Sequence, residues 1–434
     1  MTDCTQEVFD FPALKRRKVQ GEFTGGDITS DGGVLLLRQI DRRLGLMKAV
    51  DGAIADPRYI THSQLSLLQQ RVYGIALGYE DLNDHETLRN DPAIQTSVER
   101  DDVLGSQSTL CRLENRVNRA VALRLHEVLL DQFIASFAEQ PEELILDFDA
   151  TDDPVHGHQE GCFFHGYYDH YCFLPLYVFC ADQLLVSYLR PSKIDGAKHA
   201  WAILSLLVKR LRQFWPDMKI IFRGDSGFCR HHLFSWCERH NVQYTVGLAR
   251  NPRLEKRIEP LMQLVERLAE LTDESQREFL WFYYAADTWK NRRKVIAKAE
   301  VTDKGRNPRF IVTNLEGDEQ ALYEKIYCAR GDMENRIKEQ QLGLFADRTS
   351  AHHWWANQFR LLLSSLAYVL MEGIRRLGLE GTELARAQMN TIRLKLFKIG
   401  AVILRNTRYI RFLLSSAYPY QALFFNVAAR LEPG

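Results

Sequence analysis

Two apolar segments of the chain run into aspartates, and these are the first residues whose types indicate chemistry. The segment 144–149 is typical of a strand, and alternate side chains of a strand share a face, so Asp147 and Asp149 lie on the same side. A second apolar segment, 219–223, leads to Asp225, which has a glycine on either side within two residues. A buried carboxylate is costly unless it is paired or holds a cation. The pattern therefore indicates cation binding, with an aspartate that caps a turn as the ordinary alternative.

A third carboxylate lies on a predicted helix between two cations. Arg330, Glu334 and Lys338 follow one another at four-residue spacing, so at about 3.6 residues per turn they stack on one face. Tyr327 and Gln341 lie two turns to either side of Glu334. A carboxylate framed by cations suits a phosphodiester held beside a metal ion. Ion pairs on a solvated helix surface are the ordinary alternative.

Two aspartates and a glutamate can hold two Mg²⁺ ions, because Mg²⁺ takes oxygen ligands and completes its shell with water and substrate phosphate. Two such ions, about 4 Å apart, activate an attacking water or 3′-hydroxyl and stabilise the leaving oxygen of an in-line displacement. We expect Mn²⁺ to substitute for Mg²⁺ in this role. The three carboxylates together predict phosphodiester chemistry on nucleic acid.

The elements that must position these residues follow from the hydrophobic periodicity. From Val34 to about Phe137 apolar residues recur at helical spacing, which predicts an all-α N-terminal domain over 1–140. Within it, the polar stretch Gly105–Thr109 is expected to supply hydroxyl caps for the next helix. The period then changes. Strands are predicted at 143–149, 167–179, 184–189, 219–223 and 243–248, and helices at 197–214 and 230–240.

Three adjacent strands, a helix, a strand, a helix and a strand is the order of the ribonuclease-H-like α/β fold, an analogy that says nothing of chemistry by itself. Residues 250–320 interrupt this order with a charged helix and hairpin-like strands, so we expect a mainly β insertion subdomain. The catalytic domain then comprises 141–249 and 321–377. The last predicted part is a basic C-terminal helical region over 378–434, with 389–414 helical throughout.

Composition limits the partners. The chain has 56 Lys and Arg against 56 Asp and Glu, so any DNA binding must rest on local patches. The cluster Lys15-Arg16-Arg17-Lys18 is one candidate, and residues 391–434, with seven Lys or Arg against one Glu, are another. No apolar run reaches the roughly 20 residues of a membrane span, and no basic-then-apolar leader opens the chain. We therefore expect a soluble, intracellular protein without a membrane partner.

Two further motifs give weaker indications. Gly25–Gly33 is rich in glycine, but it lacks the lysine and the spacing of phosphate-binding loops, so it predicts a tight loop before a helix. The histidines and cysteine of His156–His165 could suit zinc by composition, although their spacing matches no standard finger. His352 and His353 are more typical of cap, core or phosphate contacts than of metal ligands.

On these residues the chain resembles the DDE transposases of bacterial insertion sequences, and it is most similar to insertion sequence family 1380. Tyr327, Arg330 and Glu334 match the helix signature Tyr-x2-Arg-x3-Glu-x6-Lys of that group, and Gln341 replaces the final lysine. The glycine-rich opening, the Gly-Ser-Gln-Ser-Thr-Leu stretch and the segments around the two aspartates extend the resemblance along nearly the whole chain.

The resemblance implies roles for individual residues. Asp149, Asp225 and Glu334 would form the catalytic, metal-binding triad, with Asp147 as the fallback for the first carboxylate. An aromatic residue of the insertion would support a flipped base or hairpin end, and Trp281 and Trp289 are the candidates, although tryptophan on a strand is more often core. The implied DNA and phosphate contacts are Tyr327, Arg330, Lys338, Arg348, Lys15, Arg16, Arg17 and Lys18.

The implied function is that of a DNA transposase, which cleaves at the terminal inverted repeats of its element with Mg²⁺ and joins the freed 3′-hydroxyls to target DNA. Two ends must be cut and joined together, so a homodimer on DNA in the bacterial cytoplasm is expected. Two alternatives stay open. One is a ribonuclease-H-like endonuclease without strand transfer, and the other is a catalytically silent DNA-binding derivative of a transposase.

Overall fold

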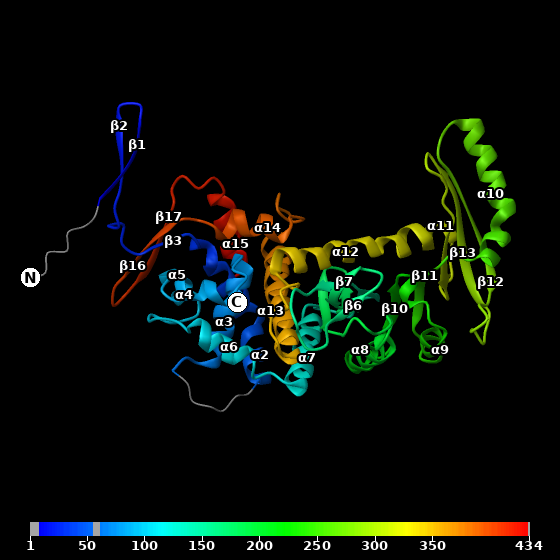
Figure 1. Cartoon of the computed structure of the whole chain (residues 1–434), viewed down its shortest axis with the longest axis horizontal. Helices are drawn as coiled ribbons and strands as arrows, with labels where there is room; N and C mark the ends of the chain where they lie inside the picture. The colour runs from blue at the N-terminus through cyan, green and yellow to red at the C-terminus, as the bar shows by residue number, and fades with distance from the viewer. Residues whose placement is uncertain (1–7, 55–60, 433–434) are drawn as a thin grey trace, which may run out of the picture. The chain divides into compact units, whose positions relative to one another are not determined.

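The computed structural model describes residues 8–54 and 61–432 (Figure 1). The chain divides into two units, which are described separately. Unit 1 comprises Met1–Glu114 and Leu370–Gly434, and unit 2 comprises Asn115–Val369. The chain returns from unit 2 to unit 1 within helix α13 (Trp354–Gly373). Among the described residues, no helix combines the length and the apolar character that crossing a membrane would require.

The centre of unit 2 is a nine-stranded mixed sheet with the strand order β12-β13-β15-β11-β10-β4-β8-β9, and β14 pairs with β13. Strand β10 runs parallel to both β4 and β11, whereas β8 is antiparallel to β4 and β9 is antiparallel to β8. The ribonuclease-H-like fold class that the sequence predicts is therefore confirmed. The five strands are β4 (Glu143–Ala150), β8 (Leu176–Cys180), β9 (Gln183–Tyr188), β10 (Lys219–Gly224) and β11 (Gln243–Leu248).

One face of this sheet packs against helices through alternate apolar side chains, such as Leu144, Leu146 and Phe148 of β4. The helices are α7 (Arg119–Ala135), α8 (Ala200–Phe214), α9 (His231–Arg239) and α10 (Pro252–Thr272). The sequence places helix α7 within an N-terminal domain that ends near residue 140. In the structure it lies in unit 2, because its apolar side chains, including Leu130 and Phe133, join the core of the sheet.

The opposite face of the sheet packs against a helical run from Glu319 to Gly343. Ile221, Ile296 and Ile311 of the sheet contact Leu322 and Tyr323 of the run. Its parts are α11 (Glu319–Ala321), the π-helical η4 (Leu322–Tyr327), η5 (Cys328–Arg330), α12 (Gly331–Lys338) and the π-helical η6 (Glu339–Gly343). The second apolar face of β4 and β10 therefore faces the element that carries Glu334.

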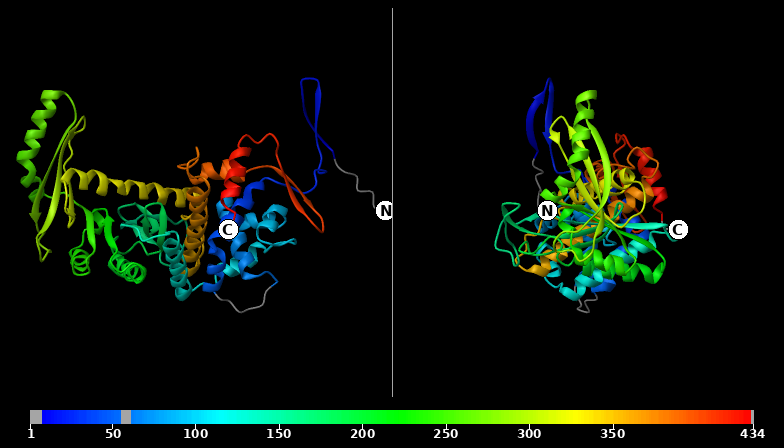
Figure 2. Two further views of the ribbon diagram at one scale, coloured as in Figure 1. Left: turned by 180° about the vertical axis from the view of Figure 1, so that it is seen from behind. Right: turned by 90° about the vertical axis from the view of Figure 1, so that its right-hand side faces the viewer.

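The insertion continues the sheet. Its strand β15 (Arg309–Thr313) pairs antiparallel with β11, and β13 (Arg293–Thr302) pairs with β15 on one side and β12 (Gln276–Tyr284) on the other. The short β14 (Gly305–Arg306) closes a turn against β13. Helix α10 lies along β12 and β13 (Figure 2). The insertion is thus mainly β, and backbone hydrogen bonds make it part of the same sheet.

Unit 1 is mainly helical. Its helices are α1 (Leu35–Leu44), α2 (Leu46–Ile54), α3 (Gln64–Leu77), α4 (His85–Leu88), α5 (Pro92–Ser97), α6 (Gln107–Glu114), α14 (Met389–Ile392) and α15 (Gln421–Arg430). Short strands precede them: β1 (Phe9–Leu14) and β2 (Arg17–Gly21) form a hairpin, followed by β3 (Ile28–Thr29). The all-α character expected for this region therefore begins after β3.

The prediction of a helix over 389–414 was wrong beyond residue 397. Residues Ala401–Arg405 (β16) and Ile410–Leu414 (β17) form a hairpin, and β3 adds to β16. The side chain of Asn406 accepts the backbone N–H groups of Arg408 and Tyr409, both at 2.9 Å, and so closes the turn. The apolar residues at 401–404 and 410–414 fit the periods of a strand and of a helix equally well. The turn at Asn406 between them favours a hairpin of two strands over one helix.

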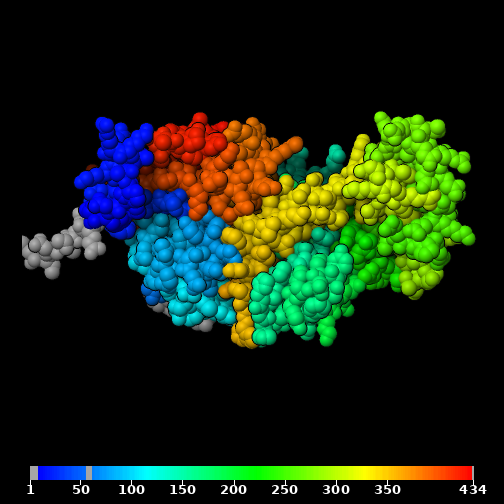
Figure 3. All heavy atoms as spheres, turned by 45° about the horizontal axis from the view of Figure 1, so that its top comes forward, coloured from blue at the N-terminus to red at the C-terminus, as the bar shows by residue number. Residues whose placement is uncertain are grey.

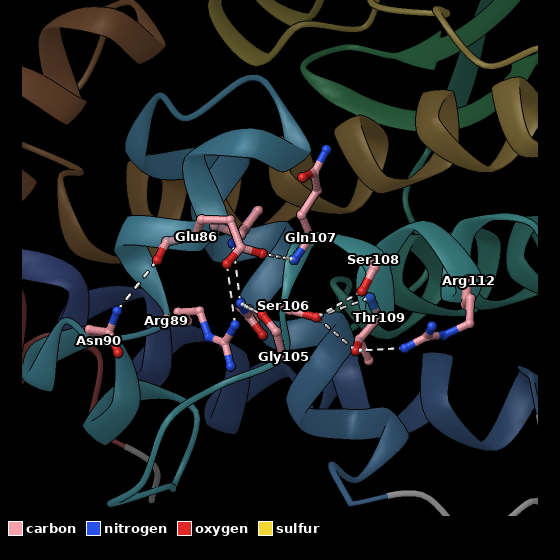
Figure 4. Close-up of polar contacts among 11 residues, drawn as sticks. Glu86, Arg89, Asn90, Gly105, Ser106, Gln107, Ser108, Thr109 and Arg112 are labelled. Carbon is pink, nitrogen blue, oxygen red and sulfur yellow. Dashed lines mark hydrogen bonds and ion pairs between the residues drawn. The ribbon is translucent and has the colours of Figure 1, made fainter.

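The Gly105–Thr109 stretch begins helix α6 (Figure 4). The Ser106 hydroxyl accepts the N–H of Thr109 at 3.4 Å, as expected for a hydroxyl cap, and lies 3.1 Å from the Thr109 hydroxyl. The carboxylate of Glu86, from α4, accepts the N–H of Gln107 at 2.8 Å. One free N–H group at this helix end is therefore satisfied from a neighbouring helix.

The glycine-rich loop at 25–33 is a packing motif. Gly32 N–H donates to the carbonyl of Ile399 at 2.9 Å, and a Cβ at Gly33 would overlap the carbonyl oxygen of Leu396. The buried carboxylate of Asp31 accepts from the Lys398 ammonium at 2.6 Å. The glycines therefore allow the backbones of the two ends of unit 1 to meet.

Candidate active site

Asp147 and Asp149 lie on the face of β4 that the helical run covers, but their surroundings differ. Asp147 is buried and paired with the buried Arg223 of β10, whose Nε and Nη2 donate to its two carboxylate oxygens, the latter at 2.6 Å. Arg223 Nη1 also donates to the carbonyl of Ile326 in the helical run. Both oxygens of the fallback carboxylate Asp147 are therefore already engaged in an ion pair.

Asp149 faces the cationic part of the helical run. The Arg330 guanidinium lies between two carboxylates, with Nη2 donating to Glu334 Oε1 at 2.6 Å and Nη1 3.9 Å from Asp149 Oδ1. Burial raises the pKa of Asp149 to about 6, and the nearby charges of Asp225 and Glu334 add to the rise that Arg330 opposes. Several negative charges therefore meet around one arginine.

Asp225 lies in the turn that follows β10. Its Oδ1 accepts the N–H of Gly227 at 2.9 Å, which begins the short 3₁₀ helix η3 (Ser226–Phe228). Gly247 of the adjacent strand β11 leaves room beside it. A Cβ there would lie 2.6 Å from the Tyr327 hydroxyl oxygen and 2.8 Å from the Ser226 nitrogen. The missing side chain thus lets the Tyr327 ring reach the turn that holds Asp225.

The three carboxylates fit divalent cations by chemistry and by placement. They come from the ends of the adjacent strands β4 and β10 and from the helical run over them, and each offers oxygen ligands. Their ligand atoms do not all lie within 4.8 Å of one another, because Arg330 lies between Asp149 and Glu334. The oxygen ligands of these carboxylates suit a divalent cation, and the Arg330 guanidinium lies between two of them.

The remaining predicted phosphate contacts of unit 2 lie near this site or on its surface. Lys338 is exposed on α12, and Arg348 is exposed in the loop before α13. Gln341, at the signature's lysine position, donates through Nε2 to the carbonyl of Asp152 at 3.0 Å. In Figure 3 the helical run, drawn in yellow, reaches the surface.

The two candidate stacking residues differ in exposure. Trp289 is 9% exposed and packs edge-on against Phe234 and Tyr284, so its ring is occupied by the core. Trp281 of β12 is 45% exposed, with the Lys294 ammonium 5.8 Å from its ring centroid. Only Trp281 of this pair presents a ring to solvent.

The predicted basic patches lie in unit 1. Lys15, Arg16, Arg17 and Lys18 are all exposed. Lys15, at φ 58°, and Arg16 form the turn between β1 and β2, and Arg17 and Lys18 begin β2 beside it. Several C-terminal cations have internal partners. Arg393 donates to the carbonyl of Ala76 at 2.8 Å, Lys398 pairs with Asp31, and Arg405 pairs with Asp27 at 3.2 Å. The hairpin turn is therefore the more available patch.

Sequence reasoning missed one cluster near the histidine-rich segment. Glu160, His352 and His353 place ligand atoms within 4.8 Å of one another, the one such group of His, Cys, Asp or Glu among the described residues. All three are exposed, and Glu160 accepts the Trp354 N–H at 3.0 Å, which caps helix α13. The capping contact accounts for the position of Glu160. Glu160 and His353 are 193 residues apart, so no local pattern in the sequence indicated that they would meet.

The strand order gives unit 2 a ribonuclease-H-like fold, with several carboxylates beneath the helical run. The chain belongs to the family described as transposase DDE domain group 1, which matches residues 11–433. A solved structure titled as the piggyBac transposase synaptic complex with hairpin DNA is similar over 85% of this chain and 80% of that chain, with 10% identity and a TM-score of 0.44. A comparison with curated proteins gave no match.

Proposed function

We propose that this chain is the transposase of a bacterial insertion sequence, which cleaves DNA at the terminal inverted repeats of its element and joins the freed 3′-hydroxyls to target DNA. The observation that supports it most is the arrangement of Asp149, Asp225 and Glu334 around Arg330, on strand ends and a helix of a DDE-family chain. The proposed setting is the bacterial cytoplasm, with chromosomal DNA as the substrate.

Asp149, Asp225 and Glu334 would hold two Mg²⁺ ions, for which Mn²⁺ would substitute. When bound, the ions activate the attacking hydroxyl and stabilise the leaving oxygen. Arg330 would leave the carboxylates and bind a phosphate of the DNA, because a guanidinium pairs with either anion. The Tyr327 hydroxyl, held beside the Asp225 turn, would orient the same strand, and the exposed Lys338 would bind a neighbouring phosphate. The proposed assembly is a homodimer on DNA, because two ends must be processed together.

The test is incubation of the protein and Mg²⁺ with DNA that carries the inverted repeats flanking its gene. Joined products would support a transposase. Nicks without joining would favour a ribonuclease-H-like endonuclease, and binding without cleavage would favour a catalytically silent derivative.

Glu334→Gln tests the triad. We expect cleavage and joining to fall by more than about 100-fold, since even the outer-shell partners of metal ligands cost 10–100-fold, while DNA binding persists. The measurement is product formation on gels alongside binding by fluorescence anisotropy. Asp332→Asn, which removes an exposed carboxylate from the same helix, is the matched control and should keep activity. Cleavage retained by Glu334→Gln would remove Glu334 from the triad.

A further inference from the structure

A small sheet with exposed aromatic side chains begins three residues after the end of the strand that carries Asp149. Strands β5 (Asp153–Pro154), β6 (Phe163–His165) and β7 (His170–Phe173) form a small antiparallel sheet in the order β5-β7-β6. Because β5 begins three residues after the end of β4, this sheet starts where the carboxylate site ends. Residues 163–173 are called the aromatic hairpin below.

The exposed side chains of the aromatic hairpin are aromatic apart from Asp169 at its turn. Phe164 is 53% exposed, Tyr167 85% and Tyr171 56%, and Phe163 is exposed as well. Phe164 and Tyr171 are cross-strand partners with their rings 5.7 Å apart, and the rings of Tyr167 and Tyr168 lie 5.0 Å apart at the turn. The hairpin sequence contains no Leu, Ile, Val or Met. Aromatic rings without aliphatic neighbours favour planar partners, which stack on the rings, more than aliphatic partners, which pack into apolar surfaces.

A chain of polar and aromatic groups connects the hairpin with Asp152, whose carbonyl accepts from Gln341 of the helical run. His170 of β7 lies 2.9 Å from the carboxylate of Asp152, and the Tyr168 ring lies 4.9 Å from that of His165 and 6.1 Å from that of His170. Burial raises the pKa of the Tyr168 hydroxyl to about 12, and the charges of Asp152 and Asp149 contribute. Tyr168 is half-buried, and its ring lies beside the two histidines of the hairpin strands.

The hairpin also has a cation at its base. The Lys193 ammonium lies 5.2 Å from the centroid of the Phe163 ring, and the neighbouring Ser192 hydroxyl donates to the Phe163 carbonyl at 2.8 Å. The carboxylate of Asp152 has His170 as its partner, and Asp169 adopts φ 59° in the turn. A strand backbone passing the hairpin would thus meet a lysine beside the rings.

We propose that the aromatic hairpin binds unpaired nucleobases of the DNA strand whose phosphodiester lies at Asp149, Asp225 and Glu334. This inference rests on the proposed function, since it names the substrate form that the site holds. Every base has a π-face, so rings on both sides of the hairpin and at its turn can stack bases without regard to sequence. Breakage or joining next to this surface would then involve a short single-stranded segment.

The test compares two DNA substrates of one sequence, a blunt duplex and the same duplex with a five-nucleotide single-stranded tail. The full-length protein is titrated in EDTA, so that cleavage does not interfere, and 2-aminopurine in the tail reports stacking. We expect tighter binding of the tailed duplex and a fall in 2-aminopurine fluorescence. Tyr167→Ala should weaken binding of the tailed duplex at least about fivefold and leave the blunt duplex unchanged.

Three variants make the result specific. Tyr167→Phe keeps the ring and should keep the tail preference. Phe164→Ala should lower it like Tyr167→Ala. Phe214→Ala removes an exposed ring at the far end of α8, packed by Arg210, and should have no effect on either substrate. Because Tyr167 is mostly exposed, its loss should leave thermal unfolding unchanged.

Three outcomes would overturn the proposal: equal affinity of the wild type for both substrates, an equal loss on both substrates in Tyr167→Ala, or dissociation of a dimer by Phe164→Ala with the tail preference intact. The last result would assign the rings to a second copy of the chain. None of these measurements requires cleavage. If the protein prefers the tailed duplex but fails to cleave DNA, the proposed function is rejected and the base-binding role of the hairpin is kept.

Discussion

Gln341 occupies the position at which the family signature has a lysine, and its amide reaches the backbone between Asp149 and the aromatic hairpin. Its Nε2 donates to the carbonyl of Asp152 at 3.0 Å, so the side chain already crosses from the helical run to the end of β4. A lysine of similar length would place an ammonium there. The Gln341 amide donates the same kind of hydrogen bond as a lysine would, but it carries no positive charge.

Gln341→Lys should therefore strengthen DNA binding. We expect tighter binding at low salt and an increase of about one in the salt slope, the effect of one added phosphate contact. The measurement is binding affinity at several salt concentrations, with Gln341→Met as the uncharged control. An unchanged salt slope for Gln341→Lys would show that position 341 does not meet phosphate.

Several residue-scale features could be predicted from the sequence, because they depend on local spacing. The strand-end aspartates and the stack of Arg330 and Glu334 are of this kind, and the structure brings Asp149, Asp225 and Glu334 into one electrostatic cluster. The engagement of Asp147 could not be predicted, because its partner Arg223 lies 76 residues away on a parallel strand. The register of β10 against β4 determines that Asp147, and not Asp149, pairs with Arg223.

At the scale of elements, the Asp147–Arg223 pair joins two strands and the helical run. It links β4 with β10, and the bond from Arg223 to the Ile326 carbonyl continues to the helical run, four residues before Arg330. Buried ion pairs add little net stability over apolar packing, yet losing one partner leaves a buried charge alone. The pair therefore holds the helical run that carries Glu334 at a defined distance from the sheet.

Arg223→Met should destabilise unit 2 by about 3–5 kcal/mol, the usual cost of leaving one member of a buried ion pair unpaired. Denaturant unfolding followed by tryptophan fluorescence measures it. Arg253→Met is the matched control, since Arg253 and Asp287 form an exposed pair at 2.5 Å in the same unit and should contribute nothing measurable. Equal effects of the two variants would contradict the structural role of Arg223.

Helices and strands could be predicted from the sequence where their apolar residues follow a single period. The strands and helices of the ribonuclease-H-like part alternate clearly, and the sheet follows the predicted order. The hairpin β16–β17 was missed because its apolar residues fit two periods and a single asparagine closes its turn. The continuation of the sheet into the insertion could not be predicted either, since the pairing of β15 with β11 spans some sixty residues of sequence.

At the scale of the whole molecule, a net charge of zero conceals an uneven distribution of cations. Arg393, Lys398 and Arg405 hold parts of unit 1 together, whereas Lys15, Arg16, Arg17 and Lys18 are exposed on a hairpin turn. Sequence-independent DNA binding depends on cations that can reach phosphates. The hairpin turn is thus expected to dominate the salt dependence.

Replacing Lys15, Arg16, Arg17 and Lys18 together with Gln should reduce the slope of log affinity against log salt by about 0.9 for each phosphate that the turn no longer neutralises, or between about 3 and 4 in all. Affinity for duplex DNA between low and moderate salt measures it. Lys209→Gln with Lys256→Gln, two exposed lysines on α8 and α10, is the control. A slope unchanged in the fourfold variant would place the DNA-binding cations elsewhere.

The glycine-rich loop has a consequence for the order in which the protein folds during synthesis. Gly33 packs on the backbone near Leu396, and β3 pairs with β16, so the beginning of unit 1 needs partners from the end of the chain. Unit 2 is complete in the growing chain before those partners leave the ribosome. The unit with the carboxylates can therefore fold first, while the unit with the basic hairpin waits until residues 396–402 have been made.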